Sequence, residues 1–353
     1  AEQCAGRVQP SQARHDGEIR DALTASMLGG LTADDILALG DTQIAALVST
    51  QINGLSTDAI AALTTTRLLA LTTSQFSGLT SLQISALTST QVAALTTAQL
   101  TKLTATQIKG LDLTGAPGLT STQIAALTAT QVAALSTGGL ASLDPAVFQA
   151  LSTGQLGSLT TAQANALTSS EVSGLTTTQL RVLLATQVAY LSTSAIAALT
   201  ETQVANLTTT QFSALTNAQL ATITATQVAA LSTTQLNRLS TAQIVAFSST
   251  AIGGMTTTEI TALTSSQFGA LTSSQLAGLT STQLAALANT QITGMTTSQL
   301  AGLSSSALSI LTPTQIGALT ATQVAAFTPA SVAGLTSTQV AVMTSTQFAA
   351  LSS

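Results

Sequence analysis

Apolar side chains recur every eight residues along almost the whole chain. Stepping by eight from Leu31, each first position up to Leu351 is apolar, and the sixth position of each unit is apolar as well. The consensus reads Leu-Thr-x-x-Gln-(Ile/Val/Leu)-x-(Ala/Gly) and gives 40 full repeats over residues 31–350, with a degenerate repeat at 23–30. Most first positions are Leu, and the variants are Ile223, Phe247, Met255, Met295, Phe327 and Met343. A period this regular predicts a repeat architecture.

Positions 2 and 5 of the repeat carry the signature of a helix N-terminus. Position 2 is Thr, Ser or Asp in 36 of 40 repeats, and position 5 is Gln in 28. A hydroxyl followed three residues later by Gln or Glu is a capping box, so each repeat is expected to start a helix. Proline agrees, because it is tolerated at the first helical position, and Pro145, Pro313 and Pro329 all stand at position 3.

Charged residues follow the same frame. Acidic residues favour the start of a helix and basic residues its end. Among the acidic residues at positions 3 to 5 are Asp34, Asp35, Asp58, Glu171, Glu201 and Glu259, whereas Lys102, Lys109, Arg181 and Arg238 stand at positions 7 or 8. Arg67, at position 5, is an exception.

One continuous helix does not fit this pattern, because repeats of eight turn the apolar positions by about 80° per unit around a helix. The sequence therefore predicts an all-α superhelical solenoid, with a short capped helix at positions 3 to 8 of each repeat and a bend at the Leu-Thr junction. Helices this short need neighbours to stack on. The alternative is a β-solenoid, but positions 1 and 6 have opposite parity and would face opposite sides of a strand.

Composition limits the remaining choices. Hydrophobic residues make up 45%, charged residues only 6%, and the net charge is −5. This balance offers no basic surface for nucleic acid, and polar groups interrupt the chain too often for a membrane span. Residues 1–22 differ from the rest and form a polar N-terminal segment, followed by the repeat region 23–353.

Groups for catalysis are scarce, so we expect no enzyme, no catalytic residue, no metal site and no cofactor. His15, Cys4 and Tyr190 are the only residues of their kinds, and Trp is absent. Cys4 is interpreted as an incidental thiol, with an intermolecular bridge or anchoring site as the alternative. His15, beside Arg14, Asp16 and Glu18, is expected to be solvated. Two further features have bland interpretations: the adjacent Asp34 and Asp35 as helix-end charges, and the sequon at Asn206 as a chance match.

The units at residues 127–134 and 319–326, both Leu-Thr-Ala-Thr-Gln-Val-Ala-Ala, resemble the octapeptide arrays of very large bacterial exoproteins. Such proteins are often labelled haem-utilisation or adhesion proteins. The resemblance covers residues 31–353 and implies a secreted or cell-surface bacterial protein with an adhesive, matrix or filament role. The haem label is not supported by the residues, because Met255, Met295 and Met343 replace Leu at position 1 and are expected in the core.

Two kinds of function are expected. The first is a structural extracellular protein that self-associates, end to end or laterally, into filaments or biofilm matrix. The sequence stops at the start of a further repeat, 351–353, which suggests a truncated array or end-to-end stacking. The second is an adhesin or binding module whose Thr and Ser rows at positions 2 to 4 engage polysaccharide or ice.

Overall fold

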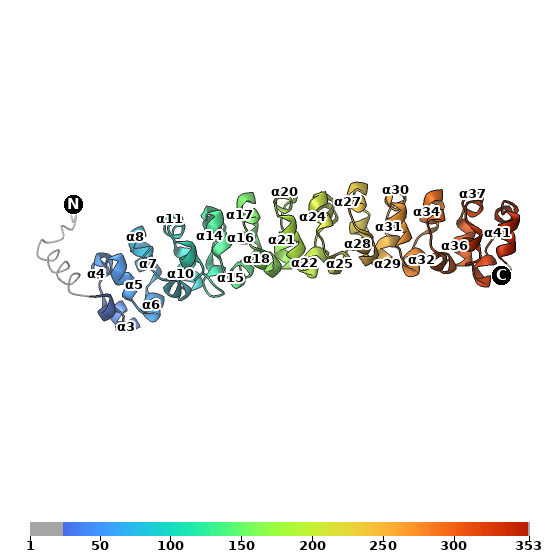
Figure 1. The fold of residues 1–353 in the computed structure, drawn as a ribbon. Coiled ribbons are helices and arrows are strands. Elements are labelled where there is room, and N and C mark those ends of the chain that lie inside the picture. Colours follow the sequence, from blue (N-terminus) through green and yellow to red (C-terminus); the bar gives the residue numbers. More distant parts are fainter. Residues whose placement is uncertain (1–23, 352–353) are drawn as a thin grey trace, which may run out of the picture. The chain divides into compact units, whose positions relative to one another are not determined.

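In the computed structural model, which describes residues 24–351, short α-helices follow one another along the chain (Figure 1). This part of the chain contains 40 α-helices, one 3₁₀-helix and no strand. The predicted all-α solenoid is therefore confirmed, and the β-solenoid alternative is wrong for these residues. No described helix has the length and apolar character needed to cross a membrane.

The helices belong to two compact units, which divide after Leu167. The first unit begins with α2, in the segment predicted as a degenerate repeat. Its elements are α2 (Ala25–Leu28), α3 (Ala33–Ala38), α4 (Asp41–Ala46), α5 (Ser49–Gly54), α6 (Thr57–Ala62), α7 (Thr65–Ala70), α8 (Thr73–Phe76), α9 (Ser81–Ser85), α10 (Ser89–Ala94), α11 (Thr97–Thr101), α12 (Ala105–Ile108), η1 (Ala116–Gly118), α13 (Ser121–Ala126), α14 (Ala129–Ala134), α15 (Thr137–Ala141), α16 (Pro145–Gln149), α17 (Thr153–Gly157) and α18 (Thr161–Ala166).

The second unit repeats the same arrangement. Its helices are α19 (Ser169–Ser173), α20 (Thr177–Arg181), α21 (Ala185–Tyr190), α22 (Thr193–Ala197), α23 (Glu201–Asn206), α24 (Thr209–Ser213), α25 (Asn217–Leu220), α26 (Ala225–Val228), α27 (Thr233–Asn237), α28 (Thr241–Ala246), α29 (Ser249–Gly253), α30 (Thr257–Ala262), α31 (Ser265–Gly269), α32 (Ser273–Ala277), α33 (Ser281–Ala286), α34 (Asn289–Thr293), α35 (Thr297–Ala301), α36 (Ser305–Ile310), α37 (Pro313–Gly317), α38 (Ala321–Val324), α39 (Pro329–Val332), α40 (Ser337–Ala341) and α41 (Ser345–Ala350).

One repeat illustrates why each helix begins and ends where it does. In α14, the N-cap Thr128 is extended, with φ −70° and ψ 157°, and its hydroxyl accepts from the Gln131 amide. Seven residues later Leu135 leaves the helical region, with ψ 142°, and starts the next repeat. The helix thus occupies positions 3 to 8, with the bend at the Leu-Thr junction, as the sequence predicts.

The two apolar positions of the repeat form the core of each unit. Position 6 is fully buried in most repeats, including the large side chains of Phe76, Phe148, Phe212 and Phe268, and position 1 is almost as buried. Position 6 and the next position 1 lie three residues apart, on one side of a short helix. Each helix therefore buries two anchors, which contribute most of the hydrophobic stabilisation.

Neighbouring helices in space are three repeats apart in sequence. Within the first unit α3 packs on α6 and α15 on α18; within the second α19 packs on α22 and α38 on α41. A turn of each superhelix therefore takes between three and four repeats, a number that the eight-residue period alone does not determine. Each turn covers the anchors of the turn before it.

Two local departures leave this frame intact. Pro145, Pro313 and Pro329 occupy the first turns of α16, α37 and α39, confirming their expected place. In residues 111–118 the 3₁₀-helix η1 replaces the α-helix, and Ala116 takes the buried place of position 6. The stack continues because the segment keeps its length.

Glycine at position 8 permits close approach between turns, and Gly78 shows the constraint clearly. A methyl group added to Gly78 would lie 2.5 Å from the carbonyl oxygen of Ser49, on the preceding turn. We expect Gly78→Ala to lower the free energy of unfolding by about 1–3 kcal/mol, since the turns must separate. Thermal unfolding followed by circular dichroism measures the change.

The matched control is Gly154→Ala in α17, where an added methyl meets nothing within 4 Å. This substitution should be neutral or stabilise by up to about 1 kcal/mol, because Ala favours the helix. Equal destabilisation by both variants would contradict the proposed close packing at Gly78.

Candidate functional site

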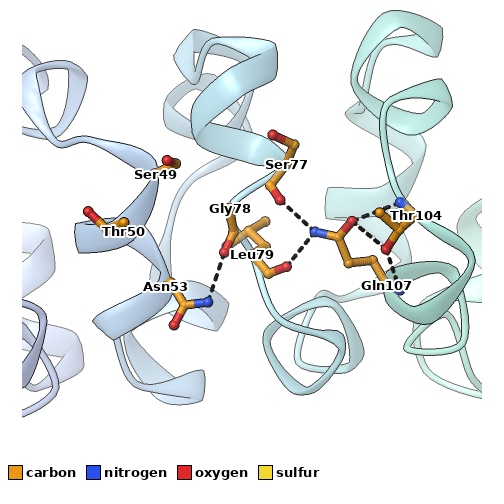
Figure 2. Close-up of a pocket in the computed structure, with 8 residues that line it drawn as sticks. All are labelled: Ser49, Thr50, Asn53, Ser77, Gly78, Leu79, Thr104 and Gln107. Carbon is orange, nitrogen blue, oxygen red and sulfur yellow. Dashed lines mark hydrogen bonds between the residues drawn. The ribbon is translucent and has the colours of Figure 1, made fainter.

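The Gln at position 5 is the polar group around which each repeat is built. Figure 2 shows Gln107, whose side-chain oxygen Oε1 accepts from the backbone amide of Thr104 at 2.8 Å and from its hydroxyl at 2.9 Å. The Thr104 hydroxyl in turn accepts from the backbone amide of Gln107 at 3.3 Å. The capping box predicted from the sequence is confirmed here and in most other repeats with Gln.

The side-chain nitrogen of the same Gln makes a second, long-range connection that the sequence did not reveal. Gln107 Nε2 donates to the carbonyl oxygens of Ser77 at 2.7 Å and Leu79 at 2.6 Å, 30 and 28 residues earlier (Figure 2). In the second unit, Gln211 Nε2 donates to Leu180 and Leu183, 31 and 28 residues earlier. The first of these carbonyls lies at the end of the helix four repeats earlier. The second belongs to the Leu that follows that helix.

This arrangement satisfies groups that a short helix cannot satisfy by itself. The last carbonyls of an α-helix lack intrahelical donors, and leaving such groups unpaired in a buried place is costly. Gln211 is 2% exposed, so its amide and the carbonyls it meets are shielded from water. Each Gln therefore joins the start of its own helix to the end of a helix one turn earlier.

Gln acts even where the hydroxyl cap is missing. At Gly40, Val48 and Ala288, which cannot cap with a side chain, the backbone amide still donates to the Gln oxygen three residues later, at 2.8–3.0 Å. The side-chain oxygen of Gln can therefore cap the start of a helix where position 2 has no hydroxyl group.

Arg67, the exception in the charge pattern, has the same long-range role. Its guanidinium donates to the carbonyls of Ile36 at 2.9 Å and Leu39 at 2.7 Å, 31 and 28 residues earlier. It also pairs with Asp41, with 2.9 Å between Nε and Oδ1. The guanidinium therefore replaces the Gln amide as a donor to the end of a helix.

Two repeats with a small residue at position 5 use Ser instead. In the repeat of Ala59, the hydroxyl of Ser56 reaches the carbonyl of Leu31 at 3.3 Å. In the repeat of Gly139, Ser136 reaches Leu111 at 3.4 Å. The Ser at position 2 thus supplies a donor that the missing Gln would have supplied.

Glu171 and Glu259 place a carboxyl group in the position of Gln. Both are almost fully buried, at 1% and 3% exposed. Glu171 Oε2 accepts from the amide and hydroxyl of Thr168, whereas Oε1 is buried without a hydrogen-bond partner among the described residues. Burial raises the pKa of Glu171, and the hydrogen bonds from Thr168 oppose that rise only in part.

The Thr and Ser positions line open polar grooves between turns. A groove of about 530 Å³ in the first unit is lined in part by Ser49, Thr50, Asn53 and Ser77 (Figure 2). Asn53 Nδ2 donates to the Gly78 carbonyl at 3.2 Å across this groove. A groove of about 400 Å³ in the second unit is lined by Thr200, Glu201, Thr202, Thr224, Thr226 and neighbouring residues. Both present hydroxyl groups beside apolar groups such as Leu79 and Leu199.

Asp34 and Asp35 lie in the first turn of α3, as predicted for helix-end charges. Asp35 Oδ2 accepts from the amide of Thr32 at 2.9 Å and from its hydroxyl at 2.7 Å. These bonds lower the pKa of Asp35, the backbone bond most. The carboxylate closes a capping box, and this contact explains its place without any catalytic role.

Of the other residues that the sequence analysis names, most lie outside the described region. Cys4, Arg14, His15, Asp16 and Glu18 precede residue 24, as does the predicted segment 1–22. Tyr190 is 56% exposed at the end of α21. Within residues 24–351, no group of three or more His, Cys, Asp or Glu side chains is arranged to hold a metal ion.

The methionines and the sequon fit the repeat. Met255 and Met295 are buried, at 3% and 4% exposed, and Met343 is half-buried, so all three take the place of the position 1 Leu. Asn206 ends α23 and its Nδ2 donates to the Thr202 carbonyl at 2.8 Å. That bond accounts for the Asn side chain within its own helix.

Comparison with known families supports a repeat protein. The model of the ALTTAQ repeat matches residues 321–353, and the hexapeptide Ala-Leu-Thr-Thr-Ala-Gln itself occurs at residues 94–99. A search of curated proteins gave no match.

The two hydrogen-bonding halves of the Gln amide can be separated by substitution. Gln235 accepts from Ser232 and donates to Val204 at 3.1 Å and Leu207 at 2.9 Å. Gln235→Glu keeps the acceptor but removes the donor, so the Leu207 carbonyl loses its side-chain partner and the Val204 carbonyl keeps only the backbone bond from Leu207. We expect the free energy of unfolding to fall by about 1–3 kcal/mol, measured by chemical denaturation.

The reverse change is the matched control. Glu259→Gln restores a donor opposite Val228 and Leu231, the residues 31 and 28 positions earlier, and should stabilise the second unit. Stabilisation by Gln235→Glu, or destabilisation by Glu259→Gln, would contradict the role assigned to the amide nitrogen.

Glu171 predicts a pH dependence of opposite sign to that of ordinary surface carboxylates. The pKa of Glu171 is higher in the folded chain than in the unfolded chain. Its contribution to the free energy of unfolding is therefore fully present below the unfolded pKa. It is lost as the pH rises through the raised, folded value. As the pH rises through this range, thermal unfolding should therefore show a smaller loss of stability for Glu171→Gln than for the natural chain.

The exposed Glu201 supplies the control for charge alone. Glu201→Gln removes the same formal charge from the surface of α23. If it changed the pH dependence as much as Glu171→Gln, burial of the Glu171 carboxyl would not be the cause.

Proposed function

We propose that this repeat protein is a structural protein of the bacterial cell surface or extracellular matrix, which self-associates into filaments. The geometry supports a structural role because most described repeats use their polar groups to join one turn to another. The hydrogen-bonding side chains mainly hold the turns of the stack together. The resemblance of the octapeptides to those of large exoproteins supports the proposed location.

One observation favours end-to-end association. Phe348, at position 6 of the last described helix, is 58% exposed, whereas Phe212 and Phe268 at the same position are fully buried. Val340 and Met343 beside it in sequence are only half-buried. A following turn of the stack would cover these anchors, and we propose that in the 353-residue protein another copy of the chain supplies that turn.

A binding role for the hydroxyl rows is the second candidate. The open grooves at Ser49 and Thr50 and at Thr200 and Thr202 present hydroxyl groups to solvent. Such groups can hydrogen-bond to polysaccharide or to ordered water. An adhesin of this kind would use the same solenoid as a scaffold.

Electron microscopy and sedimentation of the 353-residue protein test self-association. We expect ordered filaments or oligomers at high concentration, and Phe348→Ser should weaken association about tenfold or more, because an apolar anchor is removed from the contact. Leu82→Ser, which removes another exposed apolar side chain (71%), should have no such effect.

Discrete particles at all concentrations would disprove the self-association proposal. Discrete particles combined with specific binding on a glycan array would favour the adhesin instead. Disordered aggregates that both Ser variants reduce equally would show non-specific hydrophobic association, and would also count against the filament.

A further inference from the structure

A cavity in the second unit lies where one Gln is missing from the repeat. It has a volume of about 260 Å³, and its lining includes Leu276, Ala277, Leu279, Ser304 and Ala307. Ala307 occupies position 5 of its repeat, in the first turn of α36. The cavity lies between two successive turns of the stack and is more enclosed than the groove lined by Thr200 and Thr224.

The lining contains the carbonyl groups that a Gln at residue 307 would bind. In the preceding repeat, Gln299 Nε2 donates to Gly269 at 3.1 Å and Leu271 at 2.7 Å, 30 and 28 residues earlier. The residues 31, 30 and 28 positions before Ala307 are Leu276, Ala277 and Leu279, all in the cavity wall. The Ala307 methyl group cannot donate to them.

Three other repeats with Ala at position 5 bury that residue fully, and this one does not. Ala59, Ala195 and Ala251 are fully buried, and Ser56 donates to Leu31 beside Ala59. Ala307 is partly exposed, and among the described residues the Ser304 hydroxyl makes no hydrogen bond to Leu279, the equivalent of Leu31. Among the described residues, no side chain donates to the carbonyls of Leu276, Ala277 or Leu279.

Small exposures around Ala307 agree with an unfilled space. Leu276 is 2% exposed and Leu284 is 5%, whereas Phe268, Ile292 and Leu300 at the same position of nearby repeats are at 0%. The anchors next to the cavity are therefore less well covered than their neighbours.

The chain itself shows which chemical groups fit this carbonyl set. Equivalent carbonyls bind the Gln amide in most repeats and the guanidinium at Arg67. The guanidinium is accompanied by Asp41, 26 residues earlier, and the residue 26 before Ala307 is the neutral Ser281. A cation would lack its counter-charge there, so a neutral donor is favoured over a charged one.

We propose that this cavity binds small neutral molecules that end in a primary carboxamide. The NH₂ group donates to the carbonyls of Leu276, Ala277 and Leu279, as the Gln side chain does elsewhere. The carboxamide oxygen accepts from Ser304, for which Ser232 is the precedent, since its hydroxyl donates to Gln235 Oε1 at 2.9 Å. The ligand replaces, in trans, the side chain that this repeat lacks.

Titration of the full chain with propionamide, followed by saturation-transfer NMR, tests the proposal. We expect saturable binding in the millimolar range, which suits so small a ligand. Ala307→Gln, which fills the site with its own amide and restores the consensus, should weaken binding at least tenfold. N,N-dimethylpropionamide, which has no N–H donor, should not saturate.

Ala307→Leu provides a second variant, because it fills the cavity without an amide and should also abolish binding. Guanidinium chloride at low concentration should bind more weakly than propionamide. The proposal is overturned if propionamide does not saturate, if both Ala307 variants bind it as the natural chain does, or if the dimethyl compound binds equally well.

Discussion

The structure depends on the side-chain amide at position 5, because each helix is too short to satisfy its own ends. The first four amide N–H groups and the last four carbonyl groups of any α-helix lack intrahelical partners, and these helices have only four to six residues. Nearly every backbone group is therefore at an end. Gln235 hydrogen-bonds at the start of its own helix and at the end of another. Its oxygen accepts from Ser232, and its nitrogen donates to Val204 and Leu207. One planar group of fixed size thus sets the distance between successive turns.

This two-ended contact gives a physical reason for the fixed repeat length. Inserting or deleting one residue would move position 5 away from the carbonyls 28 and 31 residues earlier, and the displacement would affect the turns on both sides. Residues 111–118 show the consequence, because they abandon the α-helix and the capping sequence yet keep eight residues, with Ala116 still buried. Local conformation can vary where length cannot. For a structural protein, this constraint produces turns of uniform geometry.

Local features of the fold could be predicted from the sequence, whereas the long-range contacts could not. Hydroxyl and Gln spacing, the prolines at position 3 and the two anchors act within one repeat, so they indicate helix bounds and buried faces directly. The number of repeats per turn depends on how helices stack, and the period does not contain that information. Arg67 shows the difference. Judged by its own helix it opposes the expected charge order, but its partners are Ile36 and Leu39 on another turn. The cavity at Ala307 was equally hidden, since Ala59 in the same position is fully buried.

Because position 5 acts through a side chain, it can change while the backbone stays the same. Arg67 adds an ion pair, Glu171 adds a buried carboxyl, and Ala307 leaves a cavity. At Ala59 the hydroxyl of Ser56, from position 2, becomes the donor. Each substitution alters the local donors and acceptors without altering the eight-residue frame. A uniform stack can therefore carry chemically distinct places along its length, one per repeat. The constraint that makes the fold monotonous is also what makes individual departures from Gln informative, since each leaves a defined set of carbonyls to be satisfied by another group.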